Sequence, residues 1–502
     1  MYRFVLGVDE RPRPLTDLEL DRLADPFARF LLRRGQFPQT LEELAAAFDA
    51  TAGQPGAMTE TRWFLLGDGG DLVWSPETGD VDRALRVVMA RSATAGGDSD
   101  VQVSTSIEVT SEQAFLQVIG WDATAGVFNY YERRGGVWIW AGDSWHALNE
   151  PSRGTGPFDS HVNGSLVMKE LKLPWSHWHS MSASINPSVL PPADPRRDAP
   201  FWTRLSGAET FESTIARPGL SRWVESRLDR VTGADHRVTE LPQLARQLVT
   251  TTTVNLVSSD QQSSVLAGNT LRLPLTFFLD FDTLVGVLGL ELDPQRAPTV
   301  DGDRYLRALR RVGVRLDDGR GFIRDGDTFF SFLVPERALE DIVVVQAMID
   351  RRILSPQLAT CLLLVDFPNP VYSARRAALL DYFPDSATAG HDGADLDRSV
   401  SQAIERAATI ADGPEAEFTE LWDRSATPGW EQTIVERVAA YLDRVTTRLS
   451  TDAGADALVR LAQGRRRTFR DSHLAEFALT LPVSDDDDRY RDLRMREDGS
   501  IH

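Results

Sequence analysis

The alternation of apolar and polar positions first indicates helices near the N-terminus. Residues 16–19 (Thr-Asp-Leu-Glu) and 40–43 (Thr-Leu-Glu-Glu) each stand before apolar side chains that recur with helical spacing. A Thr followed three residues later by Glu is typical of a helix start, because each side chain can accept a hydrogen bond from the other's backbone N–H. We therefore expect residues 1–95 to be mainly helical.

The pattern changes over residues 96–185, where we expect an antiparallel sheet. Its apolar runs are rich in β-branched and aromatic side chains, and turn sequences separate them at residues 123–126 and 133–136. Trp138 and Trp140 are two positions apart, so they would share one face of a strand. We interpret both rings as part of the core.

The remaining chain predicts a mixed α/β region over residues 186–390 and a helical region over residues 391–502. The apolar runs at 253–259, 274–281, 327–334 and 361–368 resemble buried strands, and residues 336–353 have the pattern of a helix. Residues 395–410 and 430–449 predict amphipathic helices, and the acidic residues 485–488 a solvated loop. The expected fold class is α+β.

Charge and cysteine content exclude several classes of function. The 54 basic and 74 acidic side chains give a net charge of −20, which disfavours a nucleic-acid partner. Cys361 is the one cysteine, so a disulfide within the chain, a four-cysteine zinc site and a thiolate-bound iron–sulfur cluster are excluded. The longest apolar region, 271–290, contains Asp280 and Asp282, so we expect no membrane span and a cytoplasmic location.

Common catalytic motifs are absent. The sequence has no G-x-G-x-x-G, no P-loop, no G-x-S-x-G and no H-E-x-x-H. Residues 279–283 (Leu-Asp-Phe-Asp-Thr) resemble the aspartyl-nucleophile motif of haloacid-dehalogenase-like phosphatases. That motif has a residue between its second Asp and the Thr, whereas Thr283 follows Asp282 directly. We interpret Asp280 and Asp282 as strand-end or capping residues.

Candidate chemistry concentrates in residues 121–181. This window holds half of the eight histidines, half of the twelve tryptophans and both lysines, Lys169 and Lys172. In an extended segment, His177, His179 and Met181 would project to the same side. Two imidazoles on one side can bind zinc, copper or iron, and a thioether favours copper. The third ligand would be His161 or His146, or else a carboxylate from Glu170 or Asp159.

Two functions from different classes follow from this window. The leading hypothesis is a metal-dependent oxidoreductase or oxygenase that acts on a small molecule. Its ligands would be His161, His177 and His179, with Lys169 and Glu170 as catalytic residues; haem bound by a histidine is a variant. His146, Met181 and Lys172 are possible additional site residues. The alternative is a non-catalytic binding or assembly protein that uses the aromatic sheet, in which the histidines are structural and the lysines solvated.

Overall fold

The computed structural model describes the chain in two compact units. The residues described are 1–66, 74–79, 83, 85–166, 187–198, 202, 205–206, 208–257, 267–317, 319, 321–327, 331–390, 393–471 and 481–502. Those up to Arg227 form the first unit, and those from Leu228 onward form the second. The fold class is α+β, as expected from the sequence.

The first unit is built on a nine-stranded sheet in the order β2-β1-β8-β7-β6-β5-β4-β3-β9. Its strands are β1 (Tyr2–Arg3), β2 (Arg13–Pro14), β3 (Glu60–Leu66), β4 (Arg86–Ser92), β5 (Val101–Ser106), β6 (Leu116–Asp122), β7 (Val127–Arg134), β8 (Val137–Asp143) and β9 (Leu205–Ser206). Strands β3 to β8 pair consecutively and antiparallel, whereas β1 pairs parallel to β8 and β9 parallel to β3. The expected meander is present, and it starts before residue 96: the predicted boundary at 95/96 falls between the paired strands β4 and β5.

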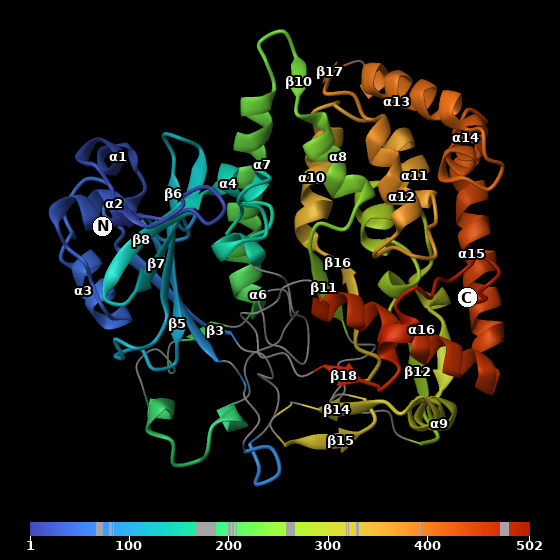
Figure 1. The fold of residues 1–502 in the computed structure, drawn as a ribbon, viewed down its shortest axis with the longest axis horizontal. Coiled ribbons are helices and arrows are strands. Elements are labelled where there is room, and N and C mark those ends of the chain that lie inside the picture. Colours follow the sequence, from blue (N-terminus) through green and yellow to red (C-terminus); the bar gives the residue numbers. More distant parts are fainter. Residues whose placement is uncertain are drawn as a thin grey trace. The chain divides into compact units, whose positions relative to one another are not determined.

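Helices cover this sheet. They are α1 (Asp17–Arg22), α2 (Pro26–Phe30), α3 (Leu41–Asp49), α4 (Ser144–Leu148), α6 (Ala208–Phe211) and α7 (Arg217–Val231), with short helices η1 (Leu32–Arg34), η2 (Gly156–Asp159), η3 (Pro187–Val189), η4 (Pro195–Asp198) and η5 (Glu212–Ala216). Helices α1 to α3, drawn in blue, lie on one side of the sheet (Figure 1). Tyr131 contacts Phe27 of α2, while its neighbour Tyr130 contacts Phe158, as alternation along a strand requires.

The predicted helix starts are present. Thr16 caps α1 with a complete capping box, in which Glu19 also accepts a hydrogen bond from the Thr16 backbone N–H. Thr40 likewise accepts the Glu43 N–H and caps α3. Glu43 reaches one residue further back, to the backbone N–H of Gln39 at 2.6 Å.

The second unit is mainly helical. Its helices are α8 (Leu241–Val249), α9 (Gly302–Val312), α10 (Leu339–Asp350), α11 (Pro356–Leu364), α12 (Ala374–Ala378), α13 (Ala394–Ala407), α14 (Pro414–Ser425), α15 (Trp430–Leu449) and α16 (Asp452–Asp471), with short helices η6 (Leu275–Phe277), η7 (Thr283–Val287), η8 (Pro294–Arg296), η9 (Leu379–Tyr382) and η11 (Asp487–Tyr490). Four small antiparallel sheets accompany them. These pair β10 (Arg237–Thr239) with β17 (Ser386–Thr388), β11 (Val254–Val257) with β16 (Val334–Arg337), β12 (Thr270–Arg272) with β13 (Thr299–Asp301), and β14 (Arg315–Asp317) with β15 (Ile323–Asp325) and β18 (Pro482–Val483).

Two of the strands expected in this unit are helical instead. Residues 361–368 begin inside α11, which Ser355 caps and Pro356 opens, and residues 274–281 contain the short helix η6. A short, wholly apolar run has the same appearance in a buried strand and in a buried helix, so its pattern cannot separate the two. In the run at 327–334, of which residues 328–330 lie outside the described part of the chain, strand β16 begins at Val334, after Phe332, whose φ of +53° no strand accommodates.

The acidic run at 485–488 is solvated in part, as expected: Asp485 and Asp488 are exposed even though they pair with arginines, whereas Asp487 is buried. Asp485 pairs with Arg315 at 2.8 Å and Asp488 pairs with Arg467 at 3.0 Å. Asp487 is buried against Arg470. These ion pairs hold residues 485–488, which include the start of η11, against α16 and β14.

Candidate functional site

The core of the predicted metal site lies outside the described residues. His177, His179, Lys169, Lys172, Glu170 and Met181 all fall within residues 167–186. They stay predictions from the sequence. The structure does place the two other histidines of that hypothesis, His146 and His161, together with the tryptophans of the sheet.

His146 contributes to the start of a helix. Asp143 caps α4, accepting hydrogen bonds from the backbone N–H groups of Trp145 and His146. The Nδ1 atom of His146 lies 2.7 Å from the Asp143 carboxylate and accepts a hydrogen bond from the Asp143 backbone N–H at 3.2 Å. Its ring meets Trp140 edge to face. These contacts occupy Nδ1, so only Nε2 of His146 is left to bind a metal.

His161 belongs to the aromatic packing on the opposite side of the sheet from α2. It follows η2, its backbone N–H donates to the Pro157 carbonyl at 3.0 Å, and its side chain is buried against Tyr130 with ring centroids 5.3 Å apart. Within the part of the chain that the structure describes, no group of three or more His, Cys, Asp or Glu residues is arranged to hold a metal.

Trp138 and Trp140 of the sheet are core residues. Trp138 is fully buried, contacts Phe27 and donates its indole N–H to the Pro38 carbonyl at 2.8 Å. The indole of Trp140 donates to the Asn129 side chain at 3.0 Å. The interpretation of both rings as core is therefore supported, and they offer no exposed aromatic surface.

A buried carboxylate next to these rings was not anticipated. Asp25 caps α2 and accepts hydrogen bonds from the Ala28 N–H, the Asn129 side chain and the Tyr131 hydroxyl. A Cβ on Gly120 would lie 2.5 Å from its Oδ1, so only glycine allows this approach. Burial raises the pKa of Asp25 to about 6. The sequence signal was Asp25 before Pro26, which is the arrangement of an N-cap and a first helical position.

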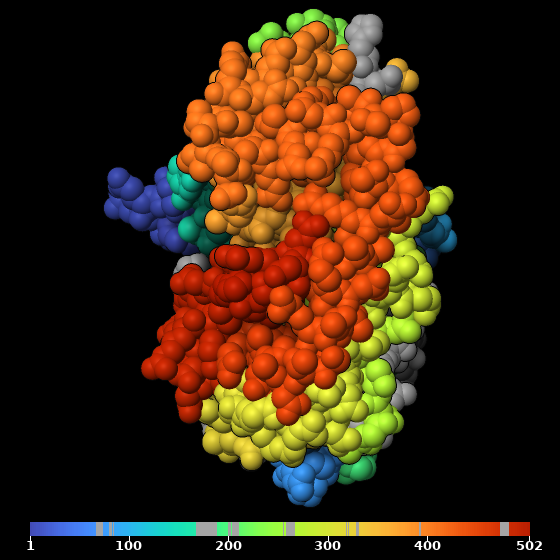
Figure 2. Space-filling view, turned by 90° about the vertical axis from the view of Figure 1, so that its right-hand side faces the viewer, coloured from blue at the N-terminus to red at the C-terminus, as the bar shows by residue number. Residues whose placement is uncertain are grey.

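The second unit contains a concave site that sequence reasoning missed. This C-terminal pocket has a volume of about 340 Å³. It lies between the loop that follows α11 and the last residues of the chain. Its lining residues are Asp366, Phe367, Pro368, Ala374, Arg375, Glu417, Arg494, Met495, Arg496 and Glu497. Figure 2 shows the C-terminal residues, in dark red, against the orange helices on this face.

One wall of the pocket is a loop in an unusual backbone conformation. Asp366 and Tyr372 both have positive φ, +52° and +63°, which costs energy for residues other than glycine. The Asp366 carboxylate accepts hydrogen bonds from the side chains of Asn369 and Ser373, at 2.7 and 2.6 Å. Strained backbone that its surroundings hold in place is concentrated at binding and catalytic sites.

Two buried arginines fix this loop from beneath. Arg376 donates to the carbonyls of Asn369 and Pro370, and Arg465 donates to the Pro368 carbonyl and the Asn369 side chain. Burial, together with the smaller effect of the charge of Arg494, lowers the pKa of Arg465 to about 10. The loop is therefore preorganised by groups that lie outside the pocket itself.

The opposite wall is a hairpin formed by residues 494–502. Arg494 and His502 exchange backbone hydrogen bonds at 2.8 and 3.0 Å, and Gly499 turns the chain with a φ of +76°. The side chain of Asn369 pairs with both backbone groups of Met495, as a neighbouring strand would. Side-chain contacts from α15 also hold the hairpin, which is therefore docked as a unit.

The polar side chains of the pocket are suited to binding. Glu417 accepts a hydrogen bond from the Asp366 backbone N–H at 3.1 Å and pairs with Arg375 at 3.0 Å. Glu497 pairs with Arg437 of α15 at 2.7 Å. Among the described residues that line the pocket there is no histidine, cysteine, serine or lysine, the usual nucleophiles and proton carriers.

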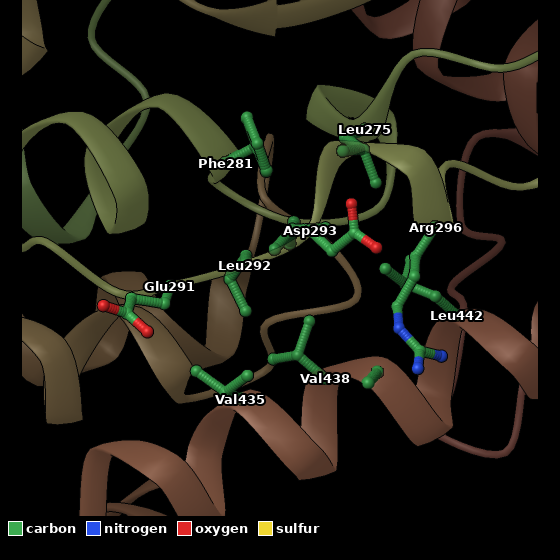
Figure 3. Close-up of a pocket in the computed structure, with 11 residues that line it drawn as sticks. Leu275, Phe281, Glu291, Leu292, Asp293, Arg296, Val435, Val438 and Leu442 are labelled. Carbon is green, nitrogen blue, oxygen red and sulfur yellow. The ribbon is translucent and has the colours of Figure 1, made fainter.

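A second, smaller crevice lies along α15. It measures about 60 Å³, and Figure 3 shows Val435 and Val438 of the helix facing Leu292, with Glu291 and Asp293 at its rim. This volume is well below that of ordinary small-molecule sites. We regard it as a packing gap.

The core of the second unit also holds a buried ion pair. Arg337 donates to Asp280 at 2.8 Å, and both side chains are almost fully buried. Asp280 is therefore a partner in a buried pair, not the strand-end or capping residue that the sequence suggested. Burial raises the pKa of the neighbouring Asp341 to about 6. The group is enclosed, so we assign it a structural role.

Comparisons with known proteins give no information about the site, so we interpret it from its geometry alone. No family model, curated protein or solved structure matches the chain. Among the described helices, none combines the length and the apolar character needed to cross a membrane.

Proposed function

We propose that the chain is a non-catalytic binding protein that holds a small molecule in the C-terminal pocket. The observation that carries this proposal is the pocket of about 340 Å³ between the strained loop and the docked hairpin. Small-molecule sites commonly measure 300–1,000 Å³ and are largely formed before the ligand arrives. Polar groups at fixed positions around the pocket would orient such a ligand.

The lining chemistry favours binding over reaction. The carboxylates of Glu417 and Glu497 are paired with arginines, so neither is free to act as a general base. The alternative of binding through the aromatic sheet receives less support, because Trp138 and Trp140 are buried. We therefore place the binding function in the second unit.

Filling the pocket tests this proposal. Ala374 lines the pocket and is exposed at the start of α12, so Ala374→Trp should occupy the space without disturbing the core. We expect ligand-observed NMR with a fragment collection to find compounds that bind the wild type and not Ala374→Trp. Ala416→Trp, a substitution outside the pocket lining, is the control. If every fragment that binds does so equally to Ala374→Trp, the proposal fails.

A metal-dependent oxidoreductase is a second proposal, and the histidine spacing in the sequence supports it. His177 and His179 would act with His161 as ligands of copper, iron or zinc, with Lys169 and Glu170 beside a small-molecule substrate. Protein purified without chelator should then hold near-stoichiometric metal, and His177→Ala with His179→Ala should lose it. A metal-free wild type that takes up none of these metals would exclude the site. A cytoplasmic location and the absence of a nucleic-acid partner stay predictions.

A further inference from the structure

We infer that the ligand of the C-terminal pocket is a small organic anion, a carboxylate or a phosphate ester with an apolar body. This inference rests on the proposed binding function and names its ligand class. It follows from the charges in and directly beneath the pocket, taken one by one.

The carboxylates of the pocket already have partners. Glu417 pairs with Arg375 at 3.0 Å, and Glu497 contacts Arg437 at 2.7 Å and Arg444 at 3.6 Å. Because these glutamates are neutralised by neighbouring cations, they offer little attraction to a cationic ligand.

The third carboxylate, Asp366, is engaged by uncharged groups. Its Oδ1 accepts from the Asn369 side chain and its Oδ2 from the Ser373 hydroxyl. Its charge therefore offsets one cation near the pocket, but both of its oxygens are committed to shaping the loop.

Several arginines, in contrast, have no carboxylate partner. In the described parts of the chain, Arg494 donates only to the backbone carbonyls of Arg491 and Leu493. Arg496 is exposed at the rim, and no side-chain partner is seen for it among the same residues. Both guanidinium groups keep donors available for a ligand.

A third cation without a carboxylate contact lies under the wall. Arg465 is buried, and its guanidinium meets the carbonyls of Phe277 and Pro368, the amide oxygen of Asn369 and the face of the Phe277 ring. A buried charge without a counter-ion is costly. A negative ligand group in the pocket would lower that cost, as well as meeting Arg494 and Arg496.

The lining itself balances three carboxylates with three arginines, and the local excess of positive charge comes from Arg437, Arg444 and Arg465 next to it, in a chain whose net charge is −20. A concave site whose charge opposes that of the whole molecule attracts anions selectively. Phe367, Pro368 and Met495 are themselves buried, so the apolar body of the ligand would meet the exposed Ala374 and the hydrocarbon stems of the lining arginines.

Four probes of one shape test the inference on the full chain: benzoate, phenyl phosphate, benzyl alcohol and benzylamine. We expect calorimetry or ligand-observed NMR to show that one or both anions bind, more tightly than the alcohol and the amine. Raising the NaCl concentration should weaken that binding. Stronger binding of benzoate than of phenyl phosphate, or the reverse, identifies which anionic group the pocket prefers.

Charge removal provides the matched comparison. Arg494→Gln with Arg496→Gln should weaken anion binding by about tenfold or more, because charge-assisted hydrogen bonds are lost. Arg496→Gln alone, at an exposed position, should give part of that loss if the double variant folds poorly. Arg489→Gln is the control, since its side chain is exposed and pairs only with Asp486 at 3.2 Å. It should bind as the wild type does.

The contrary results separate the two proposals. Binding of benzyl alcohol or benzylamine at least as tight as that of the anions, and blocked by Ala374→Trp, overturns the anion inference while the binding function stands. Anion binding that is unchanged in Arg496→Gln and in the double variant, Arg494→Gln with Arg496→Gln, also overturns the anion inference. Absence of binding by all four probes and by the wider fragment collection overturns the inference and the binding function together.

Discussion

At the scale of single residues, Asp25 shows how a polar group is kept in a core. Three hydrogen bonds replace the water that the carboxylate loses, from the Ala28 N–H, the Asn129 amide and the Tyr131 hydroxyl. They do not fully offset its burial, because the pKa of Asp25 rises to about 6. Cys361 is a simpler case: it is fully buried, and burial raises the pKa of its thiol to about 12.

The raised pKa of Asp25 predicts how the stability of the protein depends on pH. Between about pH 4 and pH 6 the folded protein keeps a proton on Asp25 that the unfolded chain has released. The free energy of unfolding therefore falls as pH rises through this window, and the contribution of Asp25 is complete below its unfolded pKa. A shift of about two units corresponds to roughly 3 kcal/mol.

Asp25→Asn should remove that dependence. Denaturant unfolding at a series of pH values should give a flatter profile between pH 4 and pH 6 for the variant than for the wild type. Part of the slope should remain, because Asp341 also has a pKa raised to about 6 by burial. Superimposable profiles for the variant and the wild type would contradict the assignment.

At the scale of elements, secondary structure is predicted best from the sequence where one side of a helix or strand faces water. Helix α15 occupies residues 430–449, the range expected, because its charged and apolar positions alternate with helical period. The caps Thr16 and Thr40 could be predicted because capping depends on neighbouring residues alone. Helix α11 could not be predicted, because nearly all of its side chains are buried and its apolar run shows no helical periodicity.

The C-terminal pocket could not be predicted in the same way. Its walls come from residues 366–375, from Glu417 and from residues 494–497, which only the folded chain brings together. Arg, Glu and Asp are common surface residues and carry no diagnostic spacing here. The available hint was the Pro-Asn-Pro sequence at 368–370, typical of a constrained loop. The predicted histidine site, by comparison, depends on residues 167–186, and its geometry stays a prediction.

The hairpin that forms one wall depends on Gly499. Its φ is +76°, and a Cβ there would lie 3.2 Å from the backbone nitrogen of Val445 on α15. Gly429 is a matched control, because it also has a positive φ, +82°, but has open space around it. Gly499→Ala should therefore loosen the hairpin more than the backbone cost of about 1 kcal/mol that both variants share.

Amide hydrogen exchange measures this difference. We expect faster exchange at Arg496 and His502 in Gly499→Ala, since both N–H groups are bonded within the hairpin. Gly429→Ala should leave exchange at these two positions unchanged. Equal exchange in the two glycine variants would show that the hairpin does not need the close approach to α15.

At the scale of the whole molecule, the two units have different characters. The first is a sheet with a core rich in tryptophan, tyrosine and phenylalanine, and the second is a helical assembly with small sheets; both contain buried arginines. The net charge of −20 describes the chain as a whole, yet the C-terminal pocket keeps Arg494 and Arg496 unneutralised beside the buried Arg465. Such a contrast between local and total charge is the physical basis of the anion proposal.

The most direct test of the central claim is amide hydrogen exchange of the wild-type protein with and without phenyl phosphate. If this anion binds in the C-terminal pocket, exchange should slow at residues 366, 367 and 369 and at residues 494–497, in the two walls that contact it. Benzyl alcohol at the same concentration should have little effect on these residues, and Ala374→Trp should abolish the protection. Unchanged exchange at both walls in saturating phenyl phosphate and benzoate would contradict the account.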